Sequence, residues 1–371
     1  MSKNTNHIPF TEVVERVIEL GRVREEVRGK VRGIVNDIYV RDIPQKEDWS
    51  FLIARSSLTT VVAYNYGGVT IQPGSSTLTF SSDVVTTSSM TGRKIHITGD
   101  DYVYDIVSQS GTTGLVIGPA FSGQETLTSA SYDIFQTTYP LNSDFDRFPK
   151  NGGLHRFSGG SKQVIPEKGY DYYLSNFSST PNDNAQFCIQ FGIDTAGNQR
   201  LEISPPTKSQ LSMEYDYIAR LRPLRETTAG LIGSVSASGT SVVGDSNTRF
   251  TEATTGDWFR IDSFGKGANS EWYSILSIAN NSTMTLATAF GLSGATSAGY
   301  TISSAMQYPP SIQPGVLYGS IAQVAADQDD PMAIAYNLKY AQVLSDGKRV
   351  FKSRHYQQDI ATIAEDYRYR Y

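Results

Sequence analysis

The sequence has few of the residues that most often carry out chemistry. Its 371 residues include one cysteine and four histidines. A single cysteine cannot form an internal disulfide, and the alternating apolar neighbours of Cys188 in AQFCIQFGI predict a buried strand position rather than a nucleophile. His7, His96, His155 and His355 are far apart and have no Cys, His or acidic partner at metal-ligand spacing. We therefore expect no metal site.

Motifs of common enzymes are also missing. The chain contains no HExxH, CxxC, GxSxG or GxxxxGKS/T. A glycan hydrolase could use the acidic pairs in GDDYVYD or SDFDRF, but Asp is also common in turns because its side chain bonds the local backbone. DQDDP lacks the Gly and Glu of an EF-hand loop, and helix capping explains it. The sequence predicts no enzyme, no catalytic residue and no cofactor.

No long hydrophobic run is present either. No segment approaches the roughly 20 apolar residues that cross a bilayer, and the N-terminal MSKNTNHIPF has no apolar core like that of a secretion signal. We expect a soluble protein made in a cytoplasm, with no membrane partner. The 32 basic and 37 acidic residues give a net charge of −5, which argues against wrapping nucleic acid by overall charge.

Helical patterns occur near both ends of the chain. TEVVERVIEL (11–20) and the following run to residue 38 have apolar residues at helical spacing. PGVLYGSIAQVAAD and DDPMAIAYNLKYAQVL repeat the pattern near the C-terminus, where Asp330 and Pro331 form a start signal. The last helix has a stripe of Ile334, Leu338, Ala341 and Leu344 or Ser345. We expect these helices to bury their stripes on one another.

A repeated phrase separates the two helical regions. TGRKIHI (91–97) resembles TGDWFRI (255–261), and 17 residues separate Tyr104 from Phe121 and also Tyr273 from Phe290. Short β-rich runs divided by Gly, Ser, Asp and Thr surround both phrases. We interpret the two regions as copies of one small all-β domain.

These patterns predict an α+β multidomain protein. Its body would be a helical bundle built from the N- and C-terminal segments, with two duplicated, sandwich- or barrel-like β domains and a central β segment inserted. The expected boundaries are 1–60 with 311–350 for the helical core, 61–140 and 230–310 for the β copies, 141–229 for the central segment, and 351–371 for a C-terminal docking arm.

Three residue groups are candidates for binding. Tyr and Arg are enriched at interface hot spots, so the tail favours an arm over a solvated end; its residues are Tyr356, Tyr367, Arg368, Tyr369, Arg370 and Tyr371. A basic run, broken by two glutamates, is either a solvated helix face or the lining of a channel; it consists of Arg22, Arg24, Arg28, Lys30 and Arg32. Trp258, Trp272 and Tyr273 could stack on sugars if they form an exposed cluster.

Several segments, taken in order, resemble head-to-tail adaptor (connector) proteins of tailed bacteriophages. The similarity begins at VRGIVNDIYVRDIPQKEDWSFL and continues through GGVTIQPGSSTLTF, GRKIHI, TYPLNSDFDRF, EYDYIARLRPL and GVLYGSIAQVAADQDDPMAIAYNLKYAQVL. Each motif is short and mainly structural, so their order carries the comparison. The second β copy, inserted after RLRPL, departs from the pattern of a simpler member.

The resemblance implies a virion structural protein of the neck or tail that is assembled in the host cytoplasm. It implies a ring of identical subunits, a dodecamer, beneath the portal protein and around the passage for viral DNA. The ring would contact this DNA transiently and without sequence specificity. Downstream tail, nozzle or fibre proteins are the other implied partners. A β-rich carbohydrate- or receptor-binding tail or collar protein is the alternative, and a glycan hydrolase is the third possibility.

Overall fold

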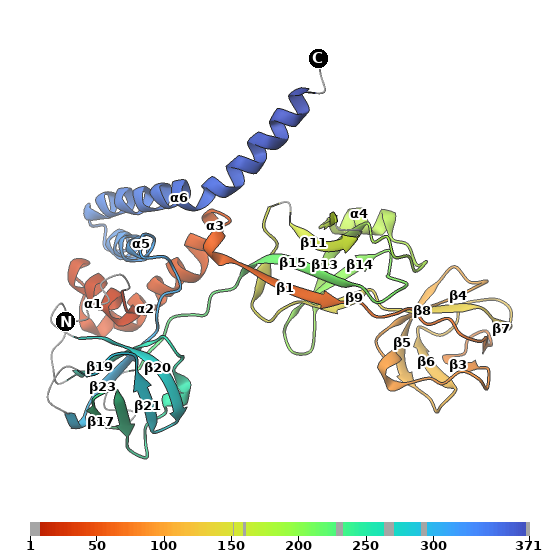
Figure 1. The fold of residues 1–371 in the computed structure, drawn as a ribbon, viewed down its shortest axis with the longest axis horizontal. Coiled ribbons are helices and arrows are strands. Elements are labelled where there is room, and N and C mark those ends of the chain that lie inside the picture. Colours follow the sequence, from red (N-terminus) through yellow and green to blue (C-terminus); the bar gives the residue numbers. More distant parts are fainter. Residues whose placement is uncertain are drawn as a thin grey trace. The chain divides into compact units, whose positions relative to one another are not determined.

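The computed structural model describes residues 8–150, 152–158, 161–227, 233–262, 271–290 and 295–368. The chain divides into two compact units. The first combines Met1–Phe51 with Leu221–Tyr371, and the second is Leu52–Arg220. The first unit therefore joins two segments that are far apart in the sequence (Figure 1).

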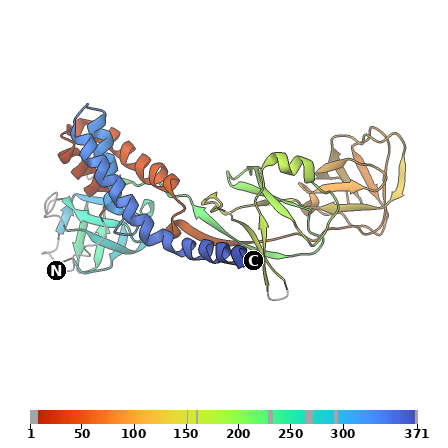
Figure 2. The ribbon, with the colours of Figure 1, turned by 90° about the horizontal axis from the view of Figure 1, so that it is seen from above.

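The first unit contains a layer of helices. The longer ones are α1 (Phe10–Leu20), α2 (Arg28–Asp37), α5 (Gln313–Ala326) and α6 (Met332–Arg368). α5 contacts α1 and α2 on one side and α6 on another (Figure 1; Figure 2). Val13, Val14 and Val17 of α1 are fully buried, which follows from the apolar stripe of that helix.

A proline widens the helix that follows α2. The π-helical turn η2 (Ile38–Asp42) leads into the short α3 (Ile43–Lys46). Pro44 has no N–H to donate to Val40, and its ring crowds that carbonyl. The Ile43 N–H instead donates to the Ile38 carbonyl. The freed Tyr39 carbonyl accepts a 2.5 Å hydrogen bond from the Tyr308 hydroxyl, which fixes this turn to the C-terminal part of the unit.

The first unit also contains a β module. Its strands are β16 (Glu226–Thr227), β17 (Val235–Ser238), β18 (Ser241–Gly244), β19 (Trp258–Ile261), β20 (Tyr273–Asn280), β21 (Thr283–Leu286), β22 (Ala295–Ala298) and β23 (Tyr300–Ser303). They pair in the order β16-β23-β19-β20-β21-β18-β17-β22. The 3₁₀ turn η5 (Phe250–Glu252) lies between β18 and β19.

The second unit contains a β module with the same strand order. Its strands are β2 (Val69–Ile71), β3 (Thr77–Phe80), β4 (Lys94–Ile97), β5 (Val103–Gln109), β6 (Gly114–Gly118), β7 (Leu127–Ala130) and β8 (Tyr132–Phe135). The order β7-β2-β3-β6-β5-β4-β8 matches β22-β17-β18-β21-β20-β19-β23 strand for strand. Both modules thus share one antiparallel topology. The module of the second unit also has a 3₁₀ turn, η4 (Ser88–Met90), before β4, the strand that corresponds to β19.

The rest of the second unit forms two further sheets. One contains β1 (Ile53–Thr59), β15 (Ser212–Ala219), β11 (Gly153–Ser158) and β12 (Ser161–Pro166), with β10 (Phe145–Arg147) pairing β15. The other contains β13 (Phe187–Ile193), β14 (Gln199–Ser204) and β9 (Thr138–Pro140), and the short helix α4 is Tyr170–Asn176. Cys188 is fully buried in β13, so its predicted place in a strand core is confirmed.

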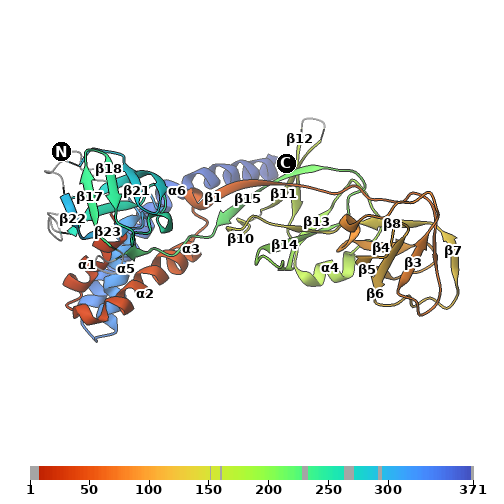
Figure 3. The ribbon, with the colours of Figure 1, turned by 90° about the horizontal axis from the view of Figure 1, so that it is seen from below.

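The predicted fold class is wrong. The protein is mainly β-structure, with 35% strand and 26% helix, and it is not a helical bundle with inserted β domains. One reason is that α1 is attached to the β module as well as to α5. Figure 3 shows α1 beside the β module. The amide of Phe10 donates to the Ser304 carbonyl at 3.3 Å, and the amide of Thr11 donates to the Ser303 hydroxyl at 2.9 Å. The helical layer and the β module are therefore joined within one compact unit.

Candidate interaction surface on the helical layer

The outer face of α6 carries exposed apolar side chains. Tyr340 and Leu344 of this helix are buried towards α5, whereas Ile334 and Leu338, one turn apart, are 71% and 68% exposed. The apolar stripe predicted for this helix is therefore divided between two faces. Leu344 lies in the core, and Ile334 and Leu338 remain available to another molecule.

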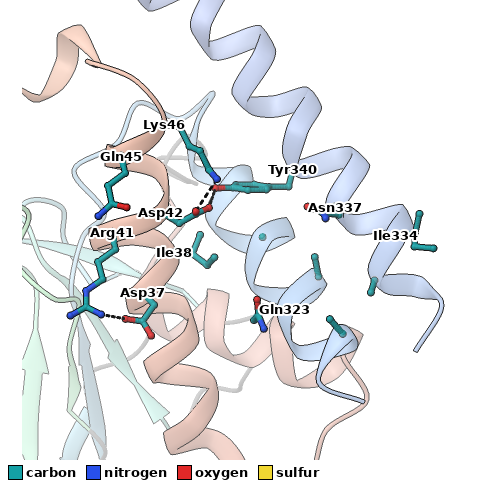
Figure 4. A pocket seen from close by; sticks show the side chains of 14 residues that line it. Asp37, Ile38, Arg41, Asp42, Gln45, Lys46, Gln323, Ile334, Asn337 and Tyr340 are labelled. Atoms are coloured by element: carbon teal, nitrogen blue, oxygen red, sulfur yellow. Dashed lines mark hydrogen bonds and ion pairs between the residues drawn. The ribbon is translucent and has the colours of Figure 1, made fainter. Parts of the chain in front are cut away.

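A groove of about 560 Å³ runs beside this face. Its walls come from α2, η2 and α3 on one side and from α5 and α6 on the other (Figure 4). Small residues, Gly319, Ala322, Ala326 and Ala333, line it and keep it open. A Cβ added at Gly319 would lie 3.2 Å from side-chain atoms of both Ile38 and Tyr340, so this glycine permits the close approach of three helices.

Charged groups along the groove are paired with one another. Asp42 accepts a short hydrogen bond from the Tyr340 hydroxyl and forms a 3.1 Å ion pair with the Lys46 ammonium (Figure 4). Arg41 and Asp37 form a looser pair at 3.8 Å. Burial raises the pKa of Tyr340, and the Asp42 carboxylate adds to this, so the tyrosine stays protonated as the donor. The groove is consequently nearly neutral, and its apolar floor adjoins the exposed face of α6.

The basic run predicted as a possible channel lining is largely engaged in ion pairs. The Arg28 guanidinium binds both carboxylate oxygens of Glu226, at 2.8 and 3.0 Å, and Arg32 lies 3.6 Å from the same carboxylate. Lys30 pairs with an aspartate at the end of α5 at 2.9 Å. Arg22 and Arg24 are exposed. Three of the five cations therefore attach α2 to its neighbours within the unit.

Glu226 is the buried centre of this network, with a side chain that has no exposed surface. Burial alone would raise its pKa, but the hydrogen bonds and charge of Arg28 outweigh burial, so the pKa lies below its ordinary value. The carboxylate is thus ionised and fixes β16 to α2. No local sequence pattern indicates this pair, because its members are 198 residues apart.

The residues of the predicted docking arm continue α6. The backbone is helical from Met332 to Arg368, which includes Tyr356, Tyr367 and Arg368. Tyr369, Arg370 and Tyr371 lie outside the described residues. The segment from 351 to 368 is therefore helical and continuous with α6, and its role as a docking arm stays a prediction.

The exposed aromatic cluster expected for glycan stacking does not form. Trp258 and Tyr273 are only 6% and 7% exposed, and Tyr273 belongs to the apolar core of the β module. Trp272 is half-buried, and the Arg260 guanidinium lies over its ring at 4.5 Å. The sequence could not separate these alternatives because aromatic residues are common in both strand cores and binding sites.

Comparisons with known proteins add no relative. No protein-family model matches the chain, and no curated protein matches it. Within the described ranges, no helix is long and apolar enough to cross a membrane, and no group of three or more His, Cys, Asp or Glu could hold a metal ion.

Proposed function

We propose that this chain is a virion structural protein, a head-to-tail adaptor of a tailed bacteriophage. It forms a ring of twelve copies beneath the portal, a dodecamer, and lines the passage for viral DNA. The ordered motifs quoted above support this proposal, from the tryptophan motif at 48–52 to the paired segments around 315–344. Its partners are other copies of the chain, the portal protein, and downstream tail, nozzle or fibre proteins, and its location is the virion neck or tail.

The exposed face of α6 is the observation that carries the proposal. Ile334 and Leu338 lie in solvent on a helix whose opposite face is already in the core. Burying two such side chains is worth about 1.5–3 kcal/mol each. A ring of identical subunits needs different surfaces that fit one another on its two sides. The α6 face beside the groove is one such surface.

Assembly with portal protein tests the proposal. Purified chain and purified portal are mixed and measured by native mass spectrometry and electron microscopy. We expect rings of about twelve copies on the portal. The double variant Ile334→Asp and Leu338→Asp should stay monomeric, because charge on this face opposes burial.

A matched control places the same change elsewhere in the same unit. Val243 and Leu276, 50% and 58% exposed, lie on the β module. Val243→Asp with Leu276→Asp should assemble normally. A wild-type chain that stays monomeric with portal, or an α6 variant that assembles as well as wild type, would contradict the proposal. Deleting 352–371 should weaken portal binding, as expected for a docking arm.

A second candidate is the carbohydrate- or receptor-binding function, and one surface of the second unit favours it. Tyr170 of α4 and Phe191 of β13 are exposed, and their rings are nearly parallel, 6.0 Å apart. Lys168 lies over the exposed Tyr172 ring at 5.4 Å. A glycan array tests this candidate: wild-type binding that is lost in Tyr170→Ala with Phe191→Ala would support it, and an array without hits would remove it.

A further inference from the structure

A cavity of about 840 Å³ lies in the first unit, away from the groove. Its walls come from α2 and η2, the segment 222–227, the segment 249–257 around η5, and β23 with the residues that follow it. Four arginines contribute to its lining: Arg32, Arg222, Arg225 and Arg249. They come from three separate parts of the sequence, and the fold brings them to one place.

Three of these arginines have no anionic partner within the described ranges. Arg222, Arg225 and Arg249 are exposed, and their guanidiniums make no ion pair or hydrogen bond there. Arg32 differs, since it lies 3.6 Å from Glu226. Guanidiniums that line a concave surface without a counter-ion repel one another, and an added anion would relieve that repulsion.

The carboxylates that line the cavity do not neutralise Arg222, Arg225 and Arg249. Glu226 is occupied by the bidentate Arg28. Asp257 accepts backbone N–H groups of Thr254 and Ala305, at 2.9 and 3.1 Å, so it is used by the local fold. Glu252 is exposed and lies more than 4 Å from any guanidinium of the cavity. The lining of the cavity therefore has an excess of positive charge.

We propose that this cavity binds an acidic peptide segment of a partner protein, through carboxylates that pair with Arg222, Arg225 and Arg249. The planar arginine fork matches a carboxylate with two parallel hydrogen bonds. Between the cations the walls carry apolar groups of Pro223, Leu224 and Ala253, which suit aliphatic parts of a peptide. This inference does not depend on the adaptor function.

The same features disfavour nucleic acid as the occupant. A cavity of this size can hold a short peptide segment with a few side chains, but it is too small for a DNA duplex to enter. A phosphate backbone would leave the apolar walls without a partner.

Peptide titration of the full-length protein tests the assignment. The probe is a fluorescein-labelled ten-residue peptide of Asp, Glu and Leu, with a second peptide that has Asn and Gln in place of the acids. We expect only the acidic peptide to bind, and its Kd to rise with salt. The triple variant Arg222→Ala, Arg225→Ala, Arg249→Ala should weaken binding by roughly tenfold or more.

A control variant removes the same number of charges elsewhere. Arg22→Ala, Arg24→Ala, Arg349→Ala should bind the acidic peptide as wild type does, because these exposed arginines lie outside the cavity. Thermal unfolding checks that both triple variants are folded. A wild-type protein that binds no acidic peptide, or a cavity variant that binds as tightly as wild type, would overturn the proposal. So would a labelled 12-nucleotide single strand that binds through these arginines when the peptide does not.

Discussion

Gly92 and Gly256 occupy equivalent positions in the two β modules. The amide of Gly92 donates to the Ile106 carbonyl and that of Gly256 to the Ile275 carbonyl, both at 2.8 Å. Both glycines have positive φ, 82° and 93°. Each lies two residues before the strand that pairs with its acceptor's strand, so the repeated Thr-Gly pair marks the same tight turn twice.

Alanine at either glycine should destabilise its own module. We expect Gly92→Ala and Gly256→Ala each to cost about 1–2 kcal/mol, because an L-residue is strained at this backbone conformation. Nothing lies within 4 Å of either added Cβ, so the cost comes from the backbone alone. Urea unfolding measures the cost, followed by circular dichroism for both variants and also by tryptophan fluorescence for Gly256→Ala, because all three tryptophans lie in the first unit.

Gly29→Ala is the control for this prediction. Gly29 lies inside α2, with open space around its added Cβ. Alanine there should leave stability unchanged or raise it by up to about 1 kcal/mol, since glycine is the poorer helix former. Equal losses at all three positions would contradict the conformational explanation.

Removing the charge of Glu226 should destabilise the first unit in a pH-dependent way. Glu226→Gln should cost about 1–3 kcal/mol near neutral pH, because Arg28 loses its bidentate partner in a largely buried place. The native pKa of Glu226 is lowered from its ordinary value of 4.5. The stability it contributes is therefore fully present above that pH and is lost as pH falls through the native pKa.

Unfolding curves of wild type and Glu226→Gln between pH 7 and pH 3 check this sign. The difference between them should be constant above about pH 5 and should shrink towards acid. Glu25→Gln is the matched control, because Glu25 also pairs with Arg28 but its side chain is 69% exposed. That variant should change stability by less than about 0.5 kcal/mol. A difference that grows towards acid would refute the assignment.

Cys188 should report opening of the second unit. Burial raises the pKa of its thiol to about 12, so almost no reactive thiolate exists at neutral pH. We expect an aromatic disulfide reagent to label the native protein only at the rate of unfolding, and to label it rapidly in 8 M urea. Fast labelling of the native protein would show that Cys188 of β13 is accessible to solvent, contrary to its burial in the structure.

Parts of this fold could be predicted from the sequence because they depend on local patterns. The stripe of α1 and the strand around Cys188 follow from spacing along the chain. The repetition is also visible in the sequence, since the Thr-Gly turn and the Tyr-to-Phe spacing recur unchanged. Helical stripes do not specify their neighbours, however, and the bundle expected from them was wrong because α1 also joins a β module.

The binding surfaces could not be predicted because they combine distant residues. Arg249 is far in the sequence from Arg222 and Arg32, and no motif links them to one cavity. The stripe of α6 similarly indicated a helix without showing that Ile334 and Leu338 would remain in solvent.

The sequence by itself determined the duplicated phrase, the amphipathic helices and the near-absence of cysteine and histidine, because composition and periodicity are properties of the chain alone. Only the tertiary structure decided which charges are neutralised. The Glu226 carboxylate neutralises the Arg28 guanidinium. Arg222, Arg225 and Arg249 line one cavity, and none of them has an anionic partner among the described residues. Charges interact through space, and the distances between them exist only in the folded chain.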